Sequence, residues 1–131
     1  MMMTEMMSTI PAMAEMDMER MQRAMDACAA CEQACTMCGD ACAMEGMGRC
    51  ASMCASTADM AGTMMRVMMR PAGMHAEAMS MMLQTTAMMM RACAEECSMH
   101  AEMAEHCRLC AKTCLAAAEA CDDLRMAMTP A

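Results

Sequence analysis

Aromatic residues are absent from this sequence of 131 residues, and leucine and β-branched aliphatic side chains are scarce. No Phe, Trp or Tyr occurs, and there are only four Leu, one Ile and one Val. Proline and glycine are also sparse, with three and five copies. A chain with so few β-branched residues and helix breakers, but much Ala and Met, favours helix over sheet. We therefore expect an all-α protein with one domain, since this length suffices for one core and is too short for two comfortable ones.

Clusters of basic residues and long apolar runs are missing as well. Nine Lys and Arg stand against seventeen Asp and Glu, for a net charge of −8. Binding a phosphate backbone needs clustered cations, and single-strand binding uses aromatic platforms, so no nucleic-acid partner is expected. No window offers eighteen apolar residues without charge, so no membrane span is expected. There is no Gly-rich phosphate loop and no Ser–His–acid grouping, so we do not expect an enzyme.

The start of the chain, MMMTEMMSTIPAM, bears on location. It has neither the basic region nor the uninterrupted apolar stretch of a secretory signal. This predicts a cytoplasmic protein, or an exported, periplasmic one if a signal peptide was removed. The methionine-rich run itself is interpreted as a flexible N-terminal arm over residues 1–10, either a collector of soft metal ions or simply a tail.

The few breakers predict where helices end. Gly46 and Gly48 mark one turn, the segment 70–73 (RPAG) marks a second, and a compact fold requires a third near 100–105, where neither Gly nor Pro occurs. We expect helices over residues 12–44, 48–70, 73–101 and 104–127, with Pro11 in the first turn of the first. Short connections make successive helices antiparallel neighbours. The predicted fold is an antiparallel up-down-up-down four-helix bundle with a Cys-lined core, in a single domain over residues 11–128.

Sulfur is what the sequence has in abundance, with 13 Cys and 30 Met. In CAACEQACTMCGDAC the cysteines are separated by gaps of three, four, three and four, which places them on one face of a helix. Extended outward, this stripe begins at Ala14 and passes Asp17, and the matching stripe of the third helix ends at His100. All the cysteines fall on such inward stripes, at one end of the expected bundle, and Met, Leu and Ala occupy the other end. They are Cys28, Cys31, Cys35, Cys38, Cys42, Cys50, Cys54, Cys93, Cys97, Cys107, Cys110, Cys114 and Cys121.

Several explanations compete for this column of thiols. A free cysteine is a small buried hydrophobe, which explains one or two of them but not thirteen. Neighbouring cysteines on one helix do not easily reach disulfide geometry, and the odd count leaves at least one thiol unpaired. Zinc sites want four ligands, and iron–sulfur clusters are usually wrapped by loops. Thiolate and thioether ligands select Cu(I), which accepts two ligands and bridging sulfurs, so a column of thiols can hold many Cu(I) ions.

Histidines near the thiol-rich end are further candidate ligands. His100 continues the inward stripe directly after Cys93 and Cys97 and is the better candidate. His106 is adjacent to Cys107, and the pattern leaves open whether it points inward or outward.

Three methionines are also candidate ligands. Met44 and Met47 flank the first turn, at the mouth of the expected thiol column, and Met90 lies on an inward stripe. Methionine is flexible core filler, and for any one of them packing is the simpler interpretation.

The motifs CxxCxxxCxxCxxxC at 28–42, CxxxCxxH at 93–100 and HCxxCxxxC at 106–114 resemble the bacterial copper storage proteins. The resemblance covers residues 24–124 and implies a four-helix bundle that stores many Cu(I) ions on its inward-facing cysteines, assembled as a homotetramer. It implies ligand roles for all the cysteines above, and it matches His100 with a histidine near the open end of the bundle. Cysteine-richer members carry thiols at five further interior positions, which are held here by Thr57, Ala61, Thr86, Met90 and Ala117.

The function expected from the residues and the resemblance together is non-enzymatic storage of Cu(I), with copper entering at the Met- and His-containing end. The alternatives are a copper chaperone or sensor that binds one or a few ions, and an iron–sulfur electron carrier.

Overall fold

The computed structural model describes residues 3–128, and this part of the chain is helical without a strand. Four helices are long, at Met18–Met44 (α2), Gly48–Met68 (α3), Ala76–Ser98 (α4) and Glu105–Met128 (α5). A short helix, α1 (Met3–Ser8), precedes them, and single turns of 3-10 helix lie at Pro11–Met13 (η1) and Pro71–Gly73 (η2). The predicted all-α class is confirmed.

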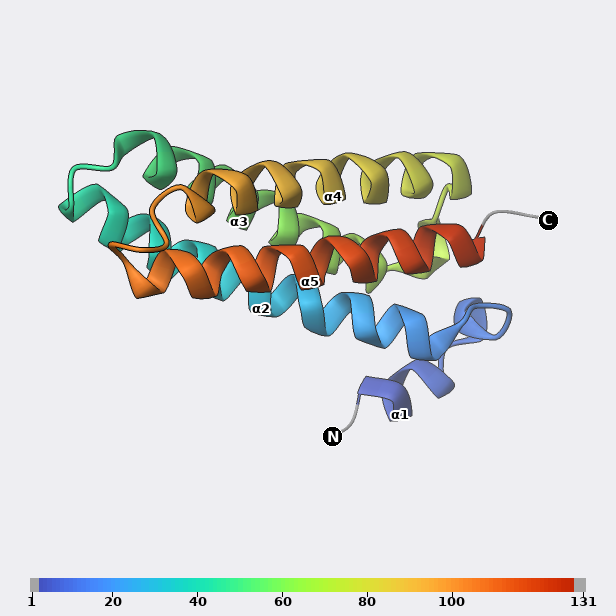
Figure 1. Cartoon of the computed structure of the whole chain (residues 1–131). Coiled ribbons are helices and arrows are strands. Elements are labelled where there is room, and N and C mark those ends of the chain that lie inside the picture. Colours follow the sequence, from blue (N-terminus) through green and yellow to red (C-terminus); the bar gives the residue numbers. More distant parts are fainter. Residues whose placement is uncertain (1–2, 129–131) are drawn as a thin grey trace.

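Figure 1 shows the four long helices side by side, and the chain reverses at each turn between them. α2 packs mainly against α3 and α5, and α4 packs against the same two helices. Gly46, in the first turn, has a φ of +78°, a left-handed conformation that glycine adopts at little cost. The third turn, which has no Gly or Pro, lies between Ser98 and Glu105 as the need for a compact fold predicts.

The N-terminal region differs from the sequence expectation. α2 begins at Met18, six residues later than predicted, because Asp17 caps it: its carboxylate accepts a hydrogen bond of 3.1 Å from the backbone N–H of Arg20. Asp17 is therefore an exposed cap, and Ala14 is exposed ahead of the helix, so neither is part of the inward stripe. In the segment expected to be a flexible arm, Met3–Ser8 forms α1, and Met7 joins the core because burial removes its apolar side chain from water.

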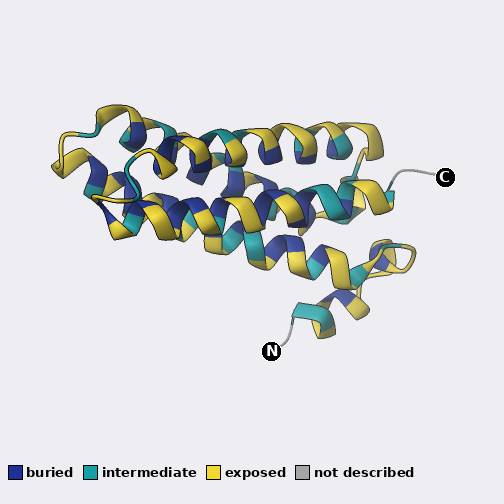
Figure 2. Ribbon diagram, viewed as in Figure 1, coloured by how far each residue is buried: buried dark blue, intermediate teal, exposed yellow. Residues whose placement is uncertain are grey.

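Buried residues line the inner faces of the long helices (Figure 2). In the part of the core near the α2–α3 turn they are mostly cysteines, which we call the thiol half. Toward the opposite end, the largest fully buried side chains are apolar, and we call this the methionine half: Met21, Met64, Met68, Leu83 and Leu124.

The helices approach closely beside the cysteines. A Cβ added at Gly39 would lie 3.2 Å from both the Ala51 carbonyl oxygen and Cys54 Cβ, so glycine lets α2 and α3 touch there. The five interior positions without a thiol are all buried as well: Thr57, Ala61, Thr86, Met90 and Ala117. No helix within residues 3–128 has the length and hydropathy needed to cross a membrane.

Candidate metal centre

All thirteen cysteines are free thiols, and none is more than 2% exposed. The three-four spacing puts them on the buried faces of α2, α3, α4 and α5, as the sequence pattern predicts. Their positions along the helices bring the C-terminal parts of α2 and α4 beside the N-terminal parts of α3 and α5. The thiol half is thus built by all four long helices.

Thiols of α2 and α5 form a ladder. Cys28 Sγ lies 3.7 Å from Cys121 Sγ, and Cys35 Sγ lies 3.7 Å from Cys110 Sγ and 3.4 Å from Cys114 Sγ. Nearer the turn, the Sγ atoms of Cys42 and Cys107 are 3.6 Å apart, and Cys31 and Cys38 make similar contacts with α5. Every cysteine of α2 therefore faces a cysteine of α5.

Thiols of α3 and α4 form a second, shorter ladder. Cys50 Sγ is 3.7 Å from Cys97 Sγ, and Cys54 Sγ is 3.7 Å from Cys93 Sγ and 3.6 Å from Cys97 Sγ. These four cysteines are all the thiols that the two helices carry.

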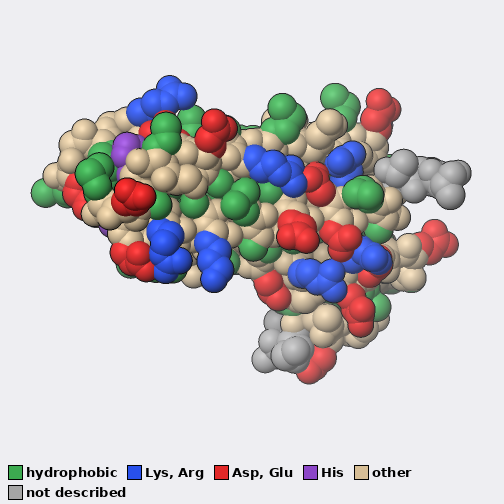
Figure 3. Space-filling model, viewed as in Figure 1, with side chains coloured by type: hydrophobic (Ala, Val, Ile, Leu, Met, Phe, Trp, Pro, Cys, Tyr) green, Lys and Arg blue, Asp and Glu red, His purple; other side chains and the backbone are tan. Residues whose placement is uncertain are grey.

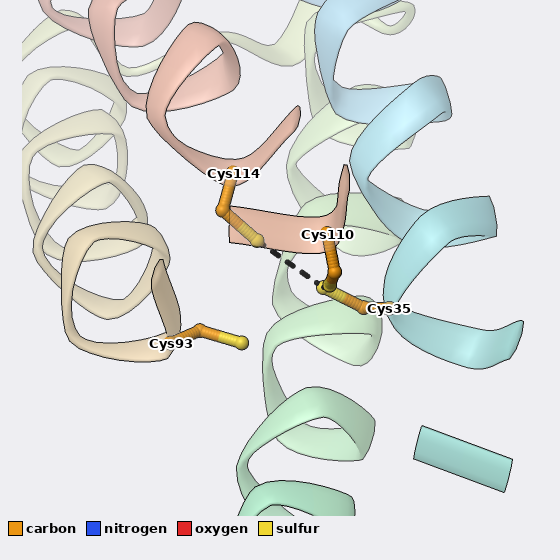
Figure 4. Close-up of side chains that lie close together, drawn as sticks. All are labelled: Cys35, Cys93, Cys110 and Cys114. Atoms are coloured by element: carbon orange, nitrogen blue, oxygen red, sulfur yellow. Dashed lines mark hydrogen bonds between the residues drawn. The ribbon is translucent and has the colours of Figure 1, made fainter. Parts of the chain in front are cut away.

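Two groups of four sulfurs join the ladders. In one, the Sγ atoms of Cys35, Cys93, Cys110 and Cys114 lie within 4.8 Å of one another, and Figure 4 shows the side chains converging from α2, α4 and α5. In the other, the same holds for Cys38, Cys54, Cys97 and Cys110. Cys110 belongs to both groups, so eleven of the thiols form one connected cluster, and Cys28 and Cys121 form a pair beside it.

The sulfur spacing fits ions of low coordination number. A metal–thiolate bond of about 2.3 Å, the length found for zinc, would hold two sulfurs about 4.0 Å apart in a trigonal site and about 4.6 Å apart across a linear one. The sulfur contacts here span 3.4 to 3.9 Å, so small side-chain movements suffice to admit an ion.

A histidine closes the cluster at the α2–α3 turn. His106 Nδ1 lies 3.2 Å from Cys38 Sγ and 3.6 Å from Cys107 Sγ, and these groups form a third potential metal site together with Cys42. On its other side, His106 Nε2 is 2.6 Å from Glu45 Oε1. The carboxylate thereby directs Nδ1 toward the thiols. A histidine side chain reaches the surface at this end of the molecule (Figure 3).

His100, which the sequence favoured over His106, is engaged elsewhere. Its Nε2 lies 2.9 Å from Glu96 Oε2, and the other oxygen of this buried carboxylate accepts a hydrogen bond of 2.9 Å from Arg49. α4 ends at Ser98, so His100 lies beyond the helix and no longer follows its stripe. The structure thus brings His106, and not His100, into the groups of potential ligands found within residues 3–128.

The three candidate methionines lie in different environments. Met44 is the last residue of α2 and is 86% exposed, whereas Met47 is partly buried against the core. Met90 is fully buried in α4, one helical turn before Cys93.

Burial and thiol–thiol hydrogen bonds separate the acidities of these cysteines. Burial, helped by other thiols, raises the pKa of Cys50 and of Cys107 to about 12. In contrast, hydrogen bonds with Cys114 and Cys35 lower the pKa of Cys31 to about 5, because they stabilise its thiolate. A soft cation that binds this cluster must displace protons from the thiols that stay protonated, so its affinity depends on pH.

Comparison with known proteins identifies this arrangement. Residues 17–126 match the sequence profile of the family described as Csp, copper storage protein. The chain belongs to the copper storage protein family. The matched region contains all the cysteines and both histidines of the thiol half. Among curated protein sequences, none matches this chain.

Solved copper storage protein structures share the fold. A structure of Ccsp, from Streptomyces lividans, loaded with 10 copper equivalents is 34% identical, covers 94% of this chain and 97% of its own, and superposes with a TM-score of 0.88. The structure of a histidine-to-alanine variant of Ccsp is 36% identical, covers 87% of this chain and 98% of its own, and has a TM-score of 0.82. A third structure, with five coppers, is described as a cytosolic copper storage protein from the same organism. It is 36% identical, covers 82% of this chain and 93% of its own, and has a TM-score of 0.79.

Proposed function

We propose that this protein stores copper by holding multiple Cu(I) ions on the thiolates of its thiol half. The observation that carries the proposal is the connected cluster of buried sulfurs, with contacts of 3.4 to 3.8 Å between helices. Thiolate is a soft ligand that selects Cu(I), and each bound Cu(I) ion offsets the charge of a thiolate that has lost its proton. Filling the core with ions therefore need not accumulate buried charge.

The proposed ligands are the thirteen cysteines, joined at the mouth by His106. Met47 and Met90, which contact the core, remain proposed thioether ligands. Met44 and His100 are proposed to act earlier, as groups of the mouth that pass copper inward, since Met44 is exposed and His100 is paired with Glu96. The proposed architecture is an antiparallel up-down-up-down four-helix bundle. A role as a non-enzymatic store is supported by family membership and by the chemistry of the core.

We further propose a cytoplasmic homotetramer. The cytoplasmic location is supported by the likeness to a protein described as cytosolic. Self-association is supported by large apolar side chains on the outer faces of α4 and α5, including Met81, Met88, Leu109 and Leu115, which are all at least 48% exposed. Light scattering after size-exclusion chromatography tests it: four copies of a 14.2 kDa chain should elute together, and a monomer would contradict the assembly.

A Cu(I) titration tests the storage function. Reduced, metal-free protein is titrated under anaerobic conditions against a chromophoric Cu(I) chelator, and free thiols are counted in parallel. We expect many tight equivalents, with loss of thiol reactivity in step with loading. The matched control is the same protein with its thiols alkylated after unfolding, which should lose these tight equivalents. Saturation at one or two ions would instead indicate a chaperone or sensor, and visible absorbance of anaerobically purified protein would indicate an iron–sulfur carrier.

A further inference from the structure

The end of the molecule opposite the mouth contains a second concentration of sulfur, which the thiol cluster does not explain. A cavity of about 230 Å³ lies where α1, the turn at Pro11–Met13, α2 and the end of α3 meet. Seven of its nine lining residues are methionines, and the other two are Ile10 and Pro71. No charged or protonatable side chain lines this space, which we call the methionine cavity. Figure 1 shows α1 beside the first turns of α2, far from the α2–α3 turn.

The methionines of the cavity come from four separate segments. Met7, Met13, Met25 and Met68 are each at most 4% exposed and belong to α1, η1, α2 and α3 in that order. Met6 and Met69, 43% and 48% exposed, lie at the rim. Thioethers thus line both the inner wall of the cavity and its opening to solvent.

The general use of methionine as apolar filler does not account for this lining. Methionine makes up 30 of the 131 residues, less than a quarter, but seven of the nine that line this cavity. The apolar cavity between α3 and α4 has only three methionines among its seven lining residues, which also include Asp59 and three threonines. Flexible methionine side chains normally close gaps in a core. Here they surround an open space.

The chemistry of the lining selects one class of ligand. Thioether sulfur is a soft, neutral donor that favours Cu(I) and its congener Ag(I) over hard cations. The last turn of α3, which ends at Met68, carries the partial negative charge of a helix C-terminus and so favours a cation beside it. The net charge of −8 acts in the same direction.

We propose that the methionine cavity binds one soft monovalent cation, Cu(I) or Ag(I), through the thioethers of Met7, Met13 and Met68. This site is separate from the thiol cluster and does not depend on storage there. It also differs in chemistry, because a thioether has no proton to lose. The affinity of this site for the cation is therefore independent of pH, whereas the affinity of the thiols falls as the pH is lowered.

Methyl NMR of methionine tests the proposal directly. Protein labelled with ¹³C at the methionine methyl groups is first saturated with Cu(I) at its thiols and freed of excess ion, under anaerobic conditions. One further equivalent of Cu(I) should shift the methyl signals of Met7, Met13 and Met68, equally at about pH 5.5 and about pH 7.5, since no proton is displaced. Shifts confined to other methionines, or none, would overturn it. Thiol counting monitors the loading of the cysteines, so a failure of storage is seen separately from a failure of the methionine cavity to bind.

Leucine substitutions provide the second test, because Met-to-Leu changes conserve volume and usually cost little stability. Met7→Leu/Met13→Leu/Met68→Leu should bind the further equivalent at least about tenfold more weakly, given that even indirect partners of metal ligands typically contribute that much. The matched control is Met21→Leu/Met64→Leu/Met79→Leu, three equally buried residues that do not line the cavity. It should bind as the unmodified protein does. Equal binding by the two triple variants would overturn the proposal. The methyl shifts of the unmodified protein decide the matter if either variant fails to fold.

Discussion

The thiol half and the methionine half of this core are built to the same plan with different side chains. Both follow the three-four spacing along the same four helices, and both are buried. In the methionine half, large side chains such as Leu83 and Met64 fill the space between helices. In the thiol half, small side chains let α2 and α3 approach at Gly39, and the sulfurs meet across the core at 3.4 to 3.8 Å. The comparison shows that helical periodicity sets which residues are inside, while residue chemistry sets whether the space between the four long helices is filled by packing or lined by thiol ligands.

Copper loading should produce the largest difference between the halves. Each site held at a hundredfold excess of Cu(I) over its dissociation constant adds about 2.7 kcal/mol to the free energy of unfolding, so several sites add roughly 10 kcal/mol. Thermal unfolding with and without Cu(I), under anaerobic conditions, measures the total. Hydrogen exchange should show protection rising in residues 28–54 and 93–114 more than in 60–85. A uniform rise would contradict the division of the core.

Alkaline pH should destabilise the reduced, metal-free protein through its thiol half. The folded pKa of Cys50 and of Cys107 is raised to about 12 by burial, whereas an unfolded thiol titrates near about 8.5. The thiols of the unfolded chain therefore lose their protons at lower pH than Cys50 and Cys107 do in the folded protein. The stability that these two protonated thiols contribute is intact below about pH 8.5 and is lost as the pH rises toward about 12. The loss is up to about 1.4 kcal/mol per pH unit for each thiol. The lowered pKa of Cys31 causes no loss in this window, because its thiol is ionised in the folded state throughout and its contribution is kept as the pH rises above about 8.5.

Urea unfolding in about one-unit steps between roughly pH 8 and 11, with a non-thiol reductant, checks this expectation. The Cu(I)-loaded protein is the control and should lack the loss, since its sulfurs hold metal in place of protons. Equal pH profiles for the two forms would show that the thiols do not carry the effect.

Truncating a packing residue of the methionine half should affect stability more, whereas truncating a cysteine of the thiol half should affect copper capacity. Leu83→Ala leaves a cavity in the core and should cost about 2–5 kcal/mol of unfolding free energy, with the number of bound Cu(I) ions unchanged. Cys93→Ala, on the same helix, removes a single sulfur and should cost only about 1 kcal/mol, but it should lower the copper count. Urea unfolding and the Cu(I) titration are carried out on both variants. A larger loss of stability in Cys93→Ala, or a lower copper count in Leu83→Ala, would contradict the division of the core into two halves.

The smallest expected effect concerns the carboxylate at the mouth. Glu45→Gln removes the charged partner of His106 Nε2, and the imidazole loses its fixed orientation toward Cys38. Partners of this kind typically contribute about 10–100-fold in metal affinity. Because Glu45 is half exposed, we expect a loss of about tenfold, at the low side of that range. The loss should concern the most weakly bound Cu(I) ions near His106. Glu105→Gln, at the same end but paired with Arg108, is the matched control and should bind as before. Chelator competition measures both, and an equal loss in both variants would rule out a specific role for Glu45.

Where sequence-based expectations failed, the residues lie at the ends of helices. Extending a helical period past the point where the helix begins or ends places Ala14, Asp17 and His100 on inward stripes. Outside the helix the period no longer applies, so Asp17 became a cap and His100 turned to Glu96. His106, inside the first turn of α5, does obey the helix geometry, and its adjacency to Cys107 was the signal that could have favoured it. The packing of α1 had no comparable signal, since a run of methionines has no period to read.

The sequence by itself determined that the protein is helical and that all thirteen cysteines face inward at one end, because the three-four spacing is a property of each helix alone. Only the tertiary structure decided which thiols meet. The ladders between α2 and α5 and between α3 and α4, the sulfurs shared through Cys110, and the orientation of His106 depend on the rotation and axial register of the packed helices. Periodicity within one helix carries no information on either quantity, whereas the sulfur-to-sulfur distances that suit a soft metal ion depend on both.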